Sequence, residues 1–102
     1  MNIYNEYSDQ IATIHIANHF TFNDSSNFHQ CLNKVFARNA QELIVDLSHL
    51  RFMDSSGIGM LIVTDTECAK HDVRLQLNNP KGEVKKILQL TRLYERFHII
   101  ES

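Results

Sequence analysis

The chain has 102 residues, the length of one small domain, so we expect a single domain over residues 1–102. Its hydrophobic fraction of 43% and charged fraction of 22% are ordinary for a soluble globular protein. The net charge of −2 provides no basic surface, which argues against nucleic-acid binding. The sequence has no run of about 20 apolar residues, so we expect no membrane span.

The N-terminal segment and the cysteines indicate the compartment. Residues 1–7 lack a charged stretch followed by an apolar one, so the sequence predicts no signal peptide. Cys31 and Cys68 are isolated and fall in predicted helices. Two free thiols fit a reducing environment. We therefore expect a cytoplasmic protein.

The first third of the chain predicts a hairpin, a loop and a helix. Residues 11–17 alternate as a strand, and residues 3–7 can pair with them through a turn at residues 8–10. Residues 18–23 are expected to be a loop. Asn23 or Asp24 is a suitable N-cap for a helix of about fifteen residues. Its apolar stripe consists of Phe28, Cys31, Leu32, Val35 and Phe36.

The middle of the chain predicts a buried strand and a second helix. Residues 43–47 are a short run of branched apolar residues, which is typical of a strand covered on both faces. The second helix is expected to begin near Ser55 or Ser56 and to end near Lys70.

The last third of the chain predicts a strand, a third helix and a short final element. Residues 73–77 alternate as a strand, and Asn79 and Pro80 suggest a cap followed by proline at the first helical position. The inward stripe of this helix is predicted to be Val84, Ile87, Leu88 and Thr91. Residues 97–100 are expected to form a short strand or a packed tail.

The predicted element order is β-β-α-β-α-β-α-β. Strands separated by helices indicate parallel pairing through right-handed crossovers. The sequence therefore predicts an α/β domain with a mixed, mostly parallel β-sheet flanked by α-helices, in which the first strand is antiparallel.

The segment Phe52-Met-Asp-Ser-Ser-Gly-Ile-Gly-Met60 is the most informative part of the chain. The hydroxyl of Ser55 or Ser56 can accept a free N–H at the start of the second helix. Gly57 and Gly59 each cost about 1 kcal/mol in a helix relative to alanine. The close approach of another backbone would explain them. A serine that only caps the helix remains an alternative, and no glycine-rich phosphate-binding motif is present.

Residues 43–61, which include Asp54-Ser-Ser-Gly-Ile-Gly59, closely resemble the STAS domain family, named for sulfate transporters and anti-sigma factor antagonists. The family pattern is an apolar strand, a few polar residues, an apolar pair and then D-S-[ST]-G-[LIV]-G. The predicted element order matches the family over nearly the whole chain. Two positions differ, because Asn18 and Arg92 stand where the family often has glycine. Asparagine tolerates a positive φ better than most residues do.

The resemblance implies a bacterial, non-enzymatic switch protein without a cofactor. In the antagonist branch, the first serine of the motif accepts phosphate, which corresponds to Ser55 here. The implied partners are a serine protein kinase of the histidine-kinase-like ATPase type, often itself the anti-sigma factor, and a PP2C-type phosphatase. The unphosphorylated form would bind the kinase, and phosphorylation would release it.

The predicted partner surface surrounds Ser55. On a helical wheel Ile58, Leu61, Ile62, Cys68 and Ala69 fall on one side, and Gly59, Met60, Val63 and Glu67 fall on the other. We therefore expect Met60 and Val63 to face solvent. Asp65 falls on the inward side without an evident reason. The predicted partner-binding residues are Thr21, Asp24, Asp54, Ser56, Gly57, Ile58, Gly59, Met60 and Val63.

Other functions are weaker alternatives. The six histidines and two cysteines show no metal-ligand spacing, so we expect no metal site. A serine hydrolase with His49 as base would lack the G-x-S-x-G motif. Within the family, a regulator of biofilm or stress signalling without a sigma factor, or a subunit of a lipid-transport complex, remains possible. We expect a monomer.

Overall fold

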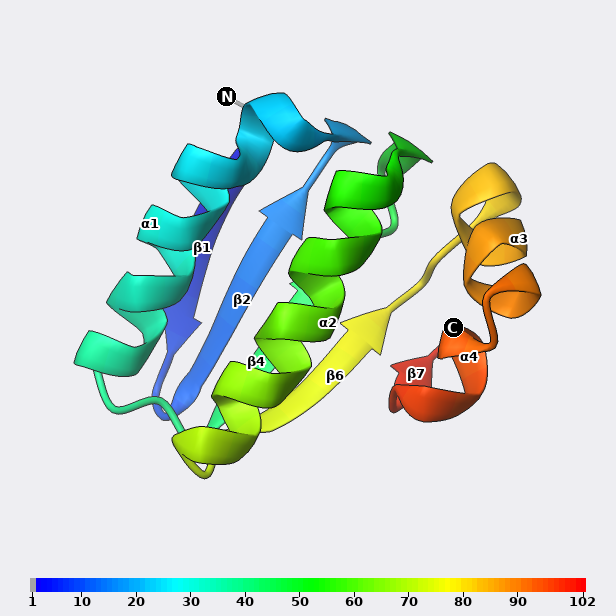
Figure 1. The fold of residues 1–102 in the computed structure, drawn as a ribbon. Helices are drawn as coiled ribbons and strands as arrows, with labels where there is room; N and C mark the ends of the chain where they lie inside the picture. Colours follow the sequence, from blue (N-terminus) through cyan, green and yellow to red (C-terminus); the bar gives the residue numbers. More distant parts are fainter. Residues whose placement is uncertain (1) are drawn as a thin grey trace.

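A five-stranded mixed sheet forms the centre of the structure, a computed structural model that describes residues 2–102. The strand order is β1 (Ile3–Ser8), β2 (Ile11–Ile16), β4 (Glu42–Asp46), β6 (Arg74–Asn78) and β7 (Ile99–Ile100). The β1–β2 pair is antiparallel, and the other pairs are parallel. Helices α1 (Ser25–Ala37) and α2 (Ser55–Lys70) lie on one face of the sheet (Figure 1). The predicted fold class is confirmed.

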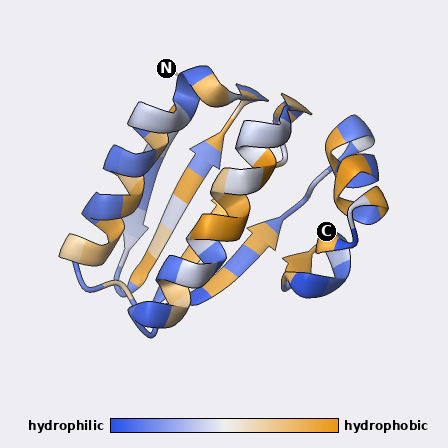
Figure 2. Ribbon diagram, in the orientation of Figure 1, coloured by the Kyte–Doolittle hydropathy of each residue, from blue (hydrophilic) through white to orange (hydrophobic). Residues whose placement is uncertain are grey.

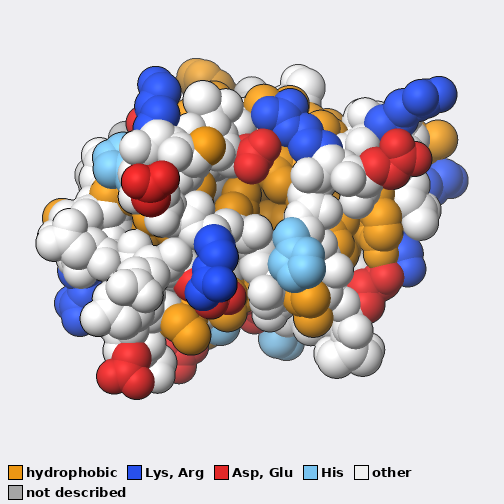
Figure 3. Space-filling model, turned by 90° about the horizontal axis from the view of Figure 1, so that it is seen from below, with side chains coloured by type: hydrophobic (Ala, Val, Ile, Leu, Met, Phe, Trp, Pro, Cys, Tyr) orange, Lys and Arg blue, Asp and Glu red, His pale blue; other side chains and the backbone are white. Residues whose placement is uncertain are grey.

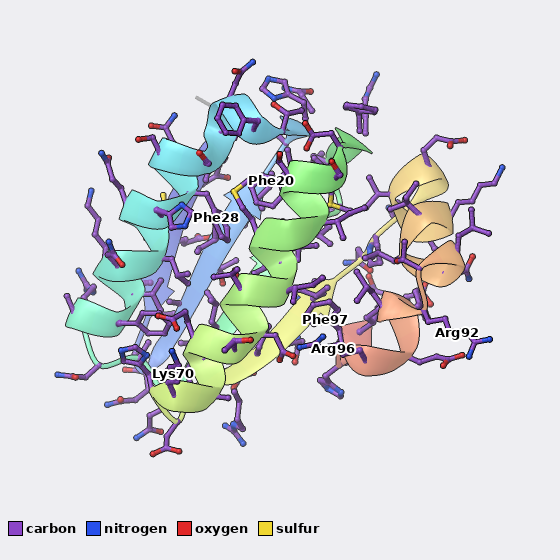
Figure 4. The ribbon with its side chains drawn as sticks, in the orientation of Figure 1. Phe20, Phe28, Lys70, Arg92, Arg96 and Phe97 are labelled. Atoms are coloured by element: carbon purple, nitrogen blue, oxygen red, sulfur yellow. The ribbon has the colours of Figure 1, made fainter. Side chains whose placement is uncertain are left out.

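The core lies between the sheet and these two helices. Alternate residues of the central strands are fully buried, as Ala12, Ile14 and Ile16 of β2 illustrate. In Figure 2 hydrophilic and hydrophobic residues are interspersed along the strands and helices, as expected for elements that are buried on one side. Phe20 and Phe28 meet edge-on with their ring centroids 4.9 Å apart, between the upper parts of α1 and α2 in the view of Figure 4.

A second, two-stranded sheet takes up residues 18–20, the first half of the loop predicted for residues 18–23. Here β3 (Asn18–Phe20) pairs in parallel with β5 (Leu50–Met53). Asn18 adopts a φ of 68°, and its N–H donates to the carbonyl of His49 at 2.9 Å. Asn18 thus adopts the positive φ that glycine adopts easily. This conformation turns the chain from β2 into the small sheet.

The third helix begins later than predicted. Lys81 is the N-cap of α3 (Gly82–Leu90), so Asn79 and Pro80 precede the helix and do not start it. Val84 and Leu88 are buried as expected. Thr91 lies beyond the last turn, is exposed, and donates its hydroxyl to the Ile87 carbonyl at 2.7 Å.

A short helix, α4 (Leu93–Arg96), follows α3 through the left-handed residue Arg92, whose φ is 63°. Arg96 donates through Nε to Asp65 Oδ2 of α2 at 3.0 Å (Figure 4). Asp65, which the helical wheel placed inward, is half-buried and forms an ion pair with Arg96. In Figure 3, which shows the end of the molecule opposite the start of α2, charged side chains of both signs are scattered over the surface.

The buried stripe of α2 differs from the predicted one. It consists of Gly57, Met60, Leu61, Thr64 and Cys68. Met60 is only 7% exposed, so the prediction that it faces solvent is wrong. Ala69, predicted to face inward, is exposed. The buried Thr64 hydroxyl donates to the Met60 carbonyl at 2.6 Å, which allows a polar residue to occupy the core.

Candidate functional site

The start of α2 is capped by an aspartate and not by a serine. Asp54 has extended backbone angles, and its Oδ1 accepts the Gly57 N–H at 2.9 Å. Its Oδ2 accepts the N–H of Phe22 at 3.3 Å. The predicted cap by Ser55 or Ser56 is therefore wrong. Aspartate caps as well as serine does, and here Asp54 stands immediately before the two serines.

This cap leaves the Ser55 hydroxyl available. Ser55 is exposed at the first residue of α2, and its side chain has no hydrogen-bond partner among residues 2–102. The first N–H groups of a helix carry partial positive charge. An anionic group attached to Ser55 Oγ would lie beside this charge. Ser56 is half-buried.

The two glycines have different surroundings. A Cβ added to Gly57 would lie less than 3.0 Å from the backbone oxygen of Phe20 and 2.6 Å from Met53 Cγ. A Cβ at Gly59 would meet nothing within 4 Å. The close approach of another backbone that was expected at the two glycines therefore occurs at Gly57, where the backbone is this chain's own, and does not occur at Gly59.

Beside the helix start, a buried carboxylate shapes the segment from Thr21 to Asp24. Asp24 is 4% exposed and accepts from Thr21 N at 2.8 Å and from Asn2 Nδ2 at 3.2 Å; His19 Nδ1 lies 2.9 Å away. Burial alone would raise the pKa of Asp24, but these hydrogen bonds outweigh it and the pKa is lowered. The carboxylate completes the capping box of the 3₁₀ turn η1 (Phe22–Asp24). Asp24 occupies the N-cap position of α1, as predicted, but its side chain makes no cap hydrogen bond there.

Two aromatic side chains that the sequence interpretation missed flank the site. Phe22 is 71% exposed and Phe52 is 56% exposed. Phe22 is held to Asp54 by its backbone, and Phe52 lies two residues before the cap. Val63 is 48% exposed on α2, as predicted. The signal in the sequence was the presence of phenylalanines on both segments that lead to the helix start.

The structure brings the two predicted parts of the partner surface together. The Phe22–Asp54 hydrogen bond joins the Thr21–Asp24 segment to the start of α2. Thr21, Asp54, Ser56, Ile58 and Gly59 are half-buried and retain exposed atoms, whereas Asp24, Gly57 and Met60 are buried. The ring of His49, considered above as the base of a serine hydrolase, places its Nδ1 3.1 Å from the hydroxyl oxygen of Ser48.

Metal binding and membrane insertion find no support in residues 2–102. Within this part of the chain, histidine, cysteine and carboxylate side chains form no group of three that could hold a metal ion. None of the helices described here has the length and apolar character needed to cross a membrane.

Comparison with known proteins identifies the family. The sequence model of the STAS domain matches residues 2–102, and the chain belongs to this family. A STAS-domain containing protein of Pseudomonas aeruginosa (strain UCBPP-PA14) is 30% identical over 90 residues, which cover 88% of each protein.

Solved structures share the fold at low sequence identity. A Thermotoga maritima protein proposed to be an anti-sigma factor antagonist matches 98% of this chain and 86% of its own, with a TM-score of 0.85 and 15% identity. The anti-sigma factor antagonist SpoIIAA in its unphosphorylated form matches 98% of this chain and 88% of its own, with a TM-score of 0.76 and 19% identity. The phosphorylated form of the Bacillus SpoIIAA matches 98% and 90%, with a TM-score of 0.77 and 20% identity.

Proposed function

We propose that this STAS domain is a phosphorylation-controlled protein-binding switch of the anti-sigma factor antagonist type, and not an enzyme. Its unphosphorylated form binds a serine kinase of the histidine-kinase-like ATPase type that also acts as an anti-sigma factor. Phosphorylation of Ser55 releases this partner, and a PP2C-type phosphatase reverses the modification. The observation that carries the proposal is the exposed Ser55 hydroxyl, left without an intramolecular partner because Asp54 caps α2.

The position of Ser55 supports a switch that acts without refolding. A phosphate adds a charge of about −1.5 to −2 at pH 7. The helix start tolerates this charge, and the nearby Asp54 carboxylate is already engaged by two N–H groups. The fold similarity to SpoIIAA is the same for its unphosphorylated and phosphorylated forms, with TM-scores of 0.76 and 0.77. We therefore expect phosphorylation to change binding and to leave the fold intact.

The proposed docking surface combines polar and apolar groups around Ser55. Phe22, Phe52 and Val63 provide exposed apolar area, and aromatic residues often contribute strongly to binding. The remaining accessible part consists of Thr21, Asp54, Ser56, Ile58 and Gly59. Asp24, Gly57 and Met60 support this surface from beneath. A phosphate on Ser55 would place bulk and negative charge within the surface and weaken docking.

Co-purification from the native host tests the proposal. We expect Ser55→Ala to retain the kinase and Ser55→Asp to lose it. Ser26→Asp is the matched control, because it adds the same charge in the first turn of α1, and it should bind as wild type does. If Ser55→Asp bound the kinase as tightly as wild type, the switch would be refuted. A partner other than a kinase, captured equally by both Ser55 variants, would favour a transport-complex subunit.

A further inference from the structure

The outer edge of β1 carries backbone groups that no strand of residues 2–102 pairs with. In the β1–β2 register Asn2 lies opposite Ala17, and the Ala17 N–H donates to the Asn2 carbonyl at 2.8 Å. Hydrogen-bonded and non-hydrogen-bonded pairs alternate along an antiparallel ladder. Tyr4, Glu6 and Ser8 therefore bond to β2. The N–H and C=O groups that point away from β2 belong to Ile3, Asn5 and Tyr7.

A groove runs beside this free edge. Its volume is about 360 Å³, and it lies between β1 and α1. The lining residues are Ile3, Tyr4, Asn5, Tyr7, Cys31 and Lys34. Ile3 is 1% exposed and Asn5 Nδ2 donates to the Cys31 carbonyl at 2.9 Å, so these side chains point towards α1. A strand added to β1 would place alternate side chains in the groove.

One wall of the groove holds a buried acceptor without a donor. Asn5 Oδ1 has no hydrogen-bond partner among residues 2–102. The amide orientation is fixed, because Nδ2 donates to the Cys31 carbonyl and to Tyr7 Oη at 2.8 Å. Turning the amide over would place two acceptor oxygens against each other. A buried acceptor left without a donor carries a desolvation penalty, which a ligand with a donor would recover.

A second copy of this chain does not fit the edge. Helix α1 packs against β1 and lies along its outer side (Figure 1). Adjacent strands are about 4.8 Å apart, whereas packed helices need about 8–10 Å between their axes. Pairing two β1 strands would bring the two α1 helices too close. The occupant must therefore be an extended segment that has no helix above it.

The positive charge beside the groove favours an acidic occupant. Lys34 lines the groove, is exposed, and has no ion pair within residues 2–102. The Arg38 guanidinium lies 3.8 Å from the centre of the Tyr7 ring and adds a second cation. We propose that β1 binds an extended acidic peptide segment of a partner protein as an added strand, with a hydrogen-bond donor opposite Asn5. This surface is distinct from the one around Ser55.

The test uses short random-sequence peptides displayed on phage and selected on the wild-type protein. We expect the selected peptides to be acidic and to slow amide exchange at Ile3, Asn5 and Tyr7. Exchange at Tyr4 and Glu6, which already bond to β2, should change little. Lys34→Glu should weaken binding about fivefold, as expected for a rim charge. The matched control Lys86→Glu, an exposed lysine of α3, should have no effect.

A second variant blocks the edge itself. The Asn5 N–H points away from β2, so Asn5→Pro removes no bond of the hairpin and should abolish peptide binding. Urea unfolding checks that Asn5→Pro folds. If it does not fold, the comparison of Lys34→Glu with Lys86→Glu tests peptide binding at β1. The proposal is overturned if no peptide is selected, if the selected peptides protect other amides, or if Lys34→Glu binds them as wild type does.

Discussion

Gly57 and Gly59 are two residues apart on one helix, yet replacing each by alanine should shift stability in opposite directions. Alanine gains about 1 kcal/mol over glycine in a helix interior. At Gly59 the added methyl meets nothing within 4 Å, so Gly59→Ala should stabilise the fold by about 1 kcal/mol. At Gly57 the methyl would come within 3.0 Å of the Phe20 carbonyl oxygen, a backbone atom that cannot rotate away.

Relieving that contact requires α2 or β3 to move. Overpacking of a core costs about 1–3 kcal/mol, so Gly57→Ala should lose up to about 2 kcal/mol after the helix gain of about 1 kcal/mol is subtracted. Urea unfolding followed by circular dichroism measures both free energies. A stabilised Gly57→Ala, or an equal loss for both variants, would refute the packing explanation. Gly59→Ala also tests the docking surface, because a stabilised variant that binds its partner less well would show that Gly59 lies in the interface.

Three further changes test the site and its supports. Asp54→Ala should lose about 1 kcal/mol of unfolding free energy, whereas Asp54→Asn, which can still cap, should lose less; urea titrations measure both. Because the pKa of Asp24 is lowered in the fold, its stabilisation is present above the unfolded value of 3.8 and is lost as the pH falls through the folded value. Asp24→Asn should therefore flatten the acid limb of the stability–pH curve, and an unchanged limb would contradict this. Burial raises the pKa of Cys68 to about 12, so a thiol reagent at about pH 8 should modify it only after unfolding; rapid labelling of the native protein, with Cys31 replaced by serine, would contradict this.

The elements that the sequence predicted well depend on local periodicity. The strand at residues 11–16 and the helix at residues 25–37 show their apolar repeats over short windows. The small sheet of β3 and β5 could not be found in this way. It joins segments about thirty residues apart, and each strand has only three or four residues. Non-local pairing leaves no periodic signal in strands this short.

The error in α2 has a different physical origin. The wheel centred the buried face on the isoleucines Ile58 and Ile62, because hydropathy ranks them as apolar. The true stripe includes Gly57, buried by its contact with the Phe20 carbonyl, and Thr64, buried because its hydroxyl is satisfied. Neither residue counts as apolar, so the predicted face was rotated by about one residue and Met60 was placed outside.

The candidate site, like the fold, was predicted only in part. The motif placed Ser55 at the start of a helix, and the structure agrees. The exposure of Phe22 and Phe52 was missed, since large aromatic residues are usually assigned to the core.

The Asp54 carboxylate joins two segments that are 32 residues apart in the sequence. Because one side chain bonds to both the start of α2 and the backbone of Phe22, it fixes the spacing between Ser55 and the Phe22 backbone. In the proposed switch, a partner then contacts two positions at once. The charge on residue 55 decides whether it binds, and the side chain at residue 22 decides which partner binds. Substitutions at Phe22 could therefore redirect the protein to another kinase while the phosphate-accepting residue stays the same, which would keep parallel switches in one cell separate.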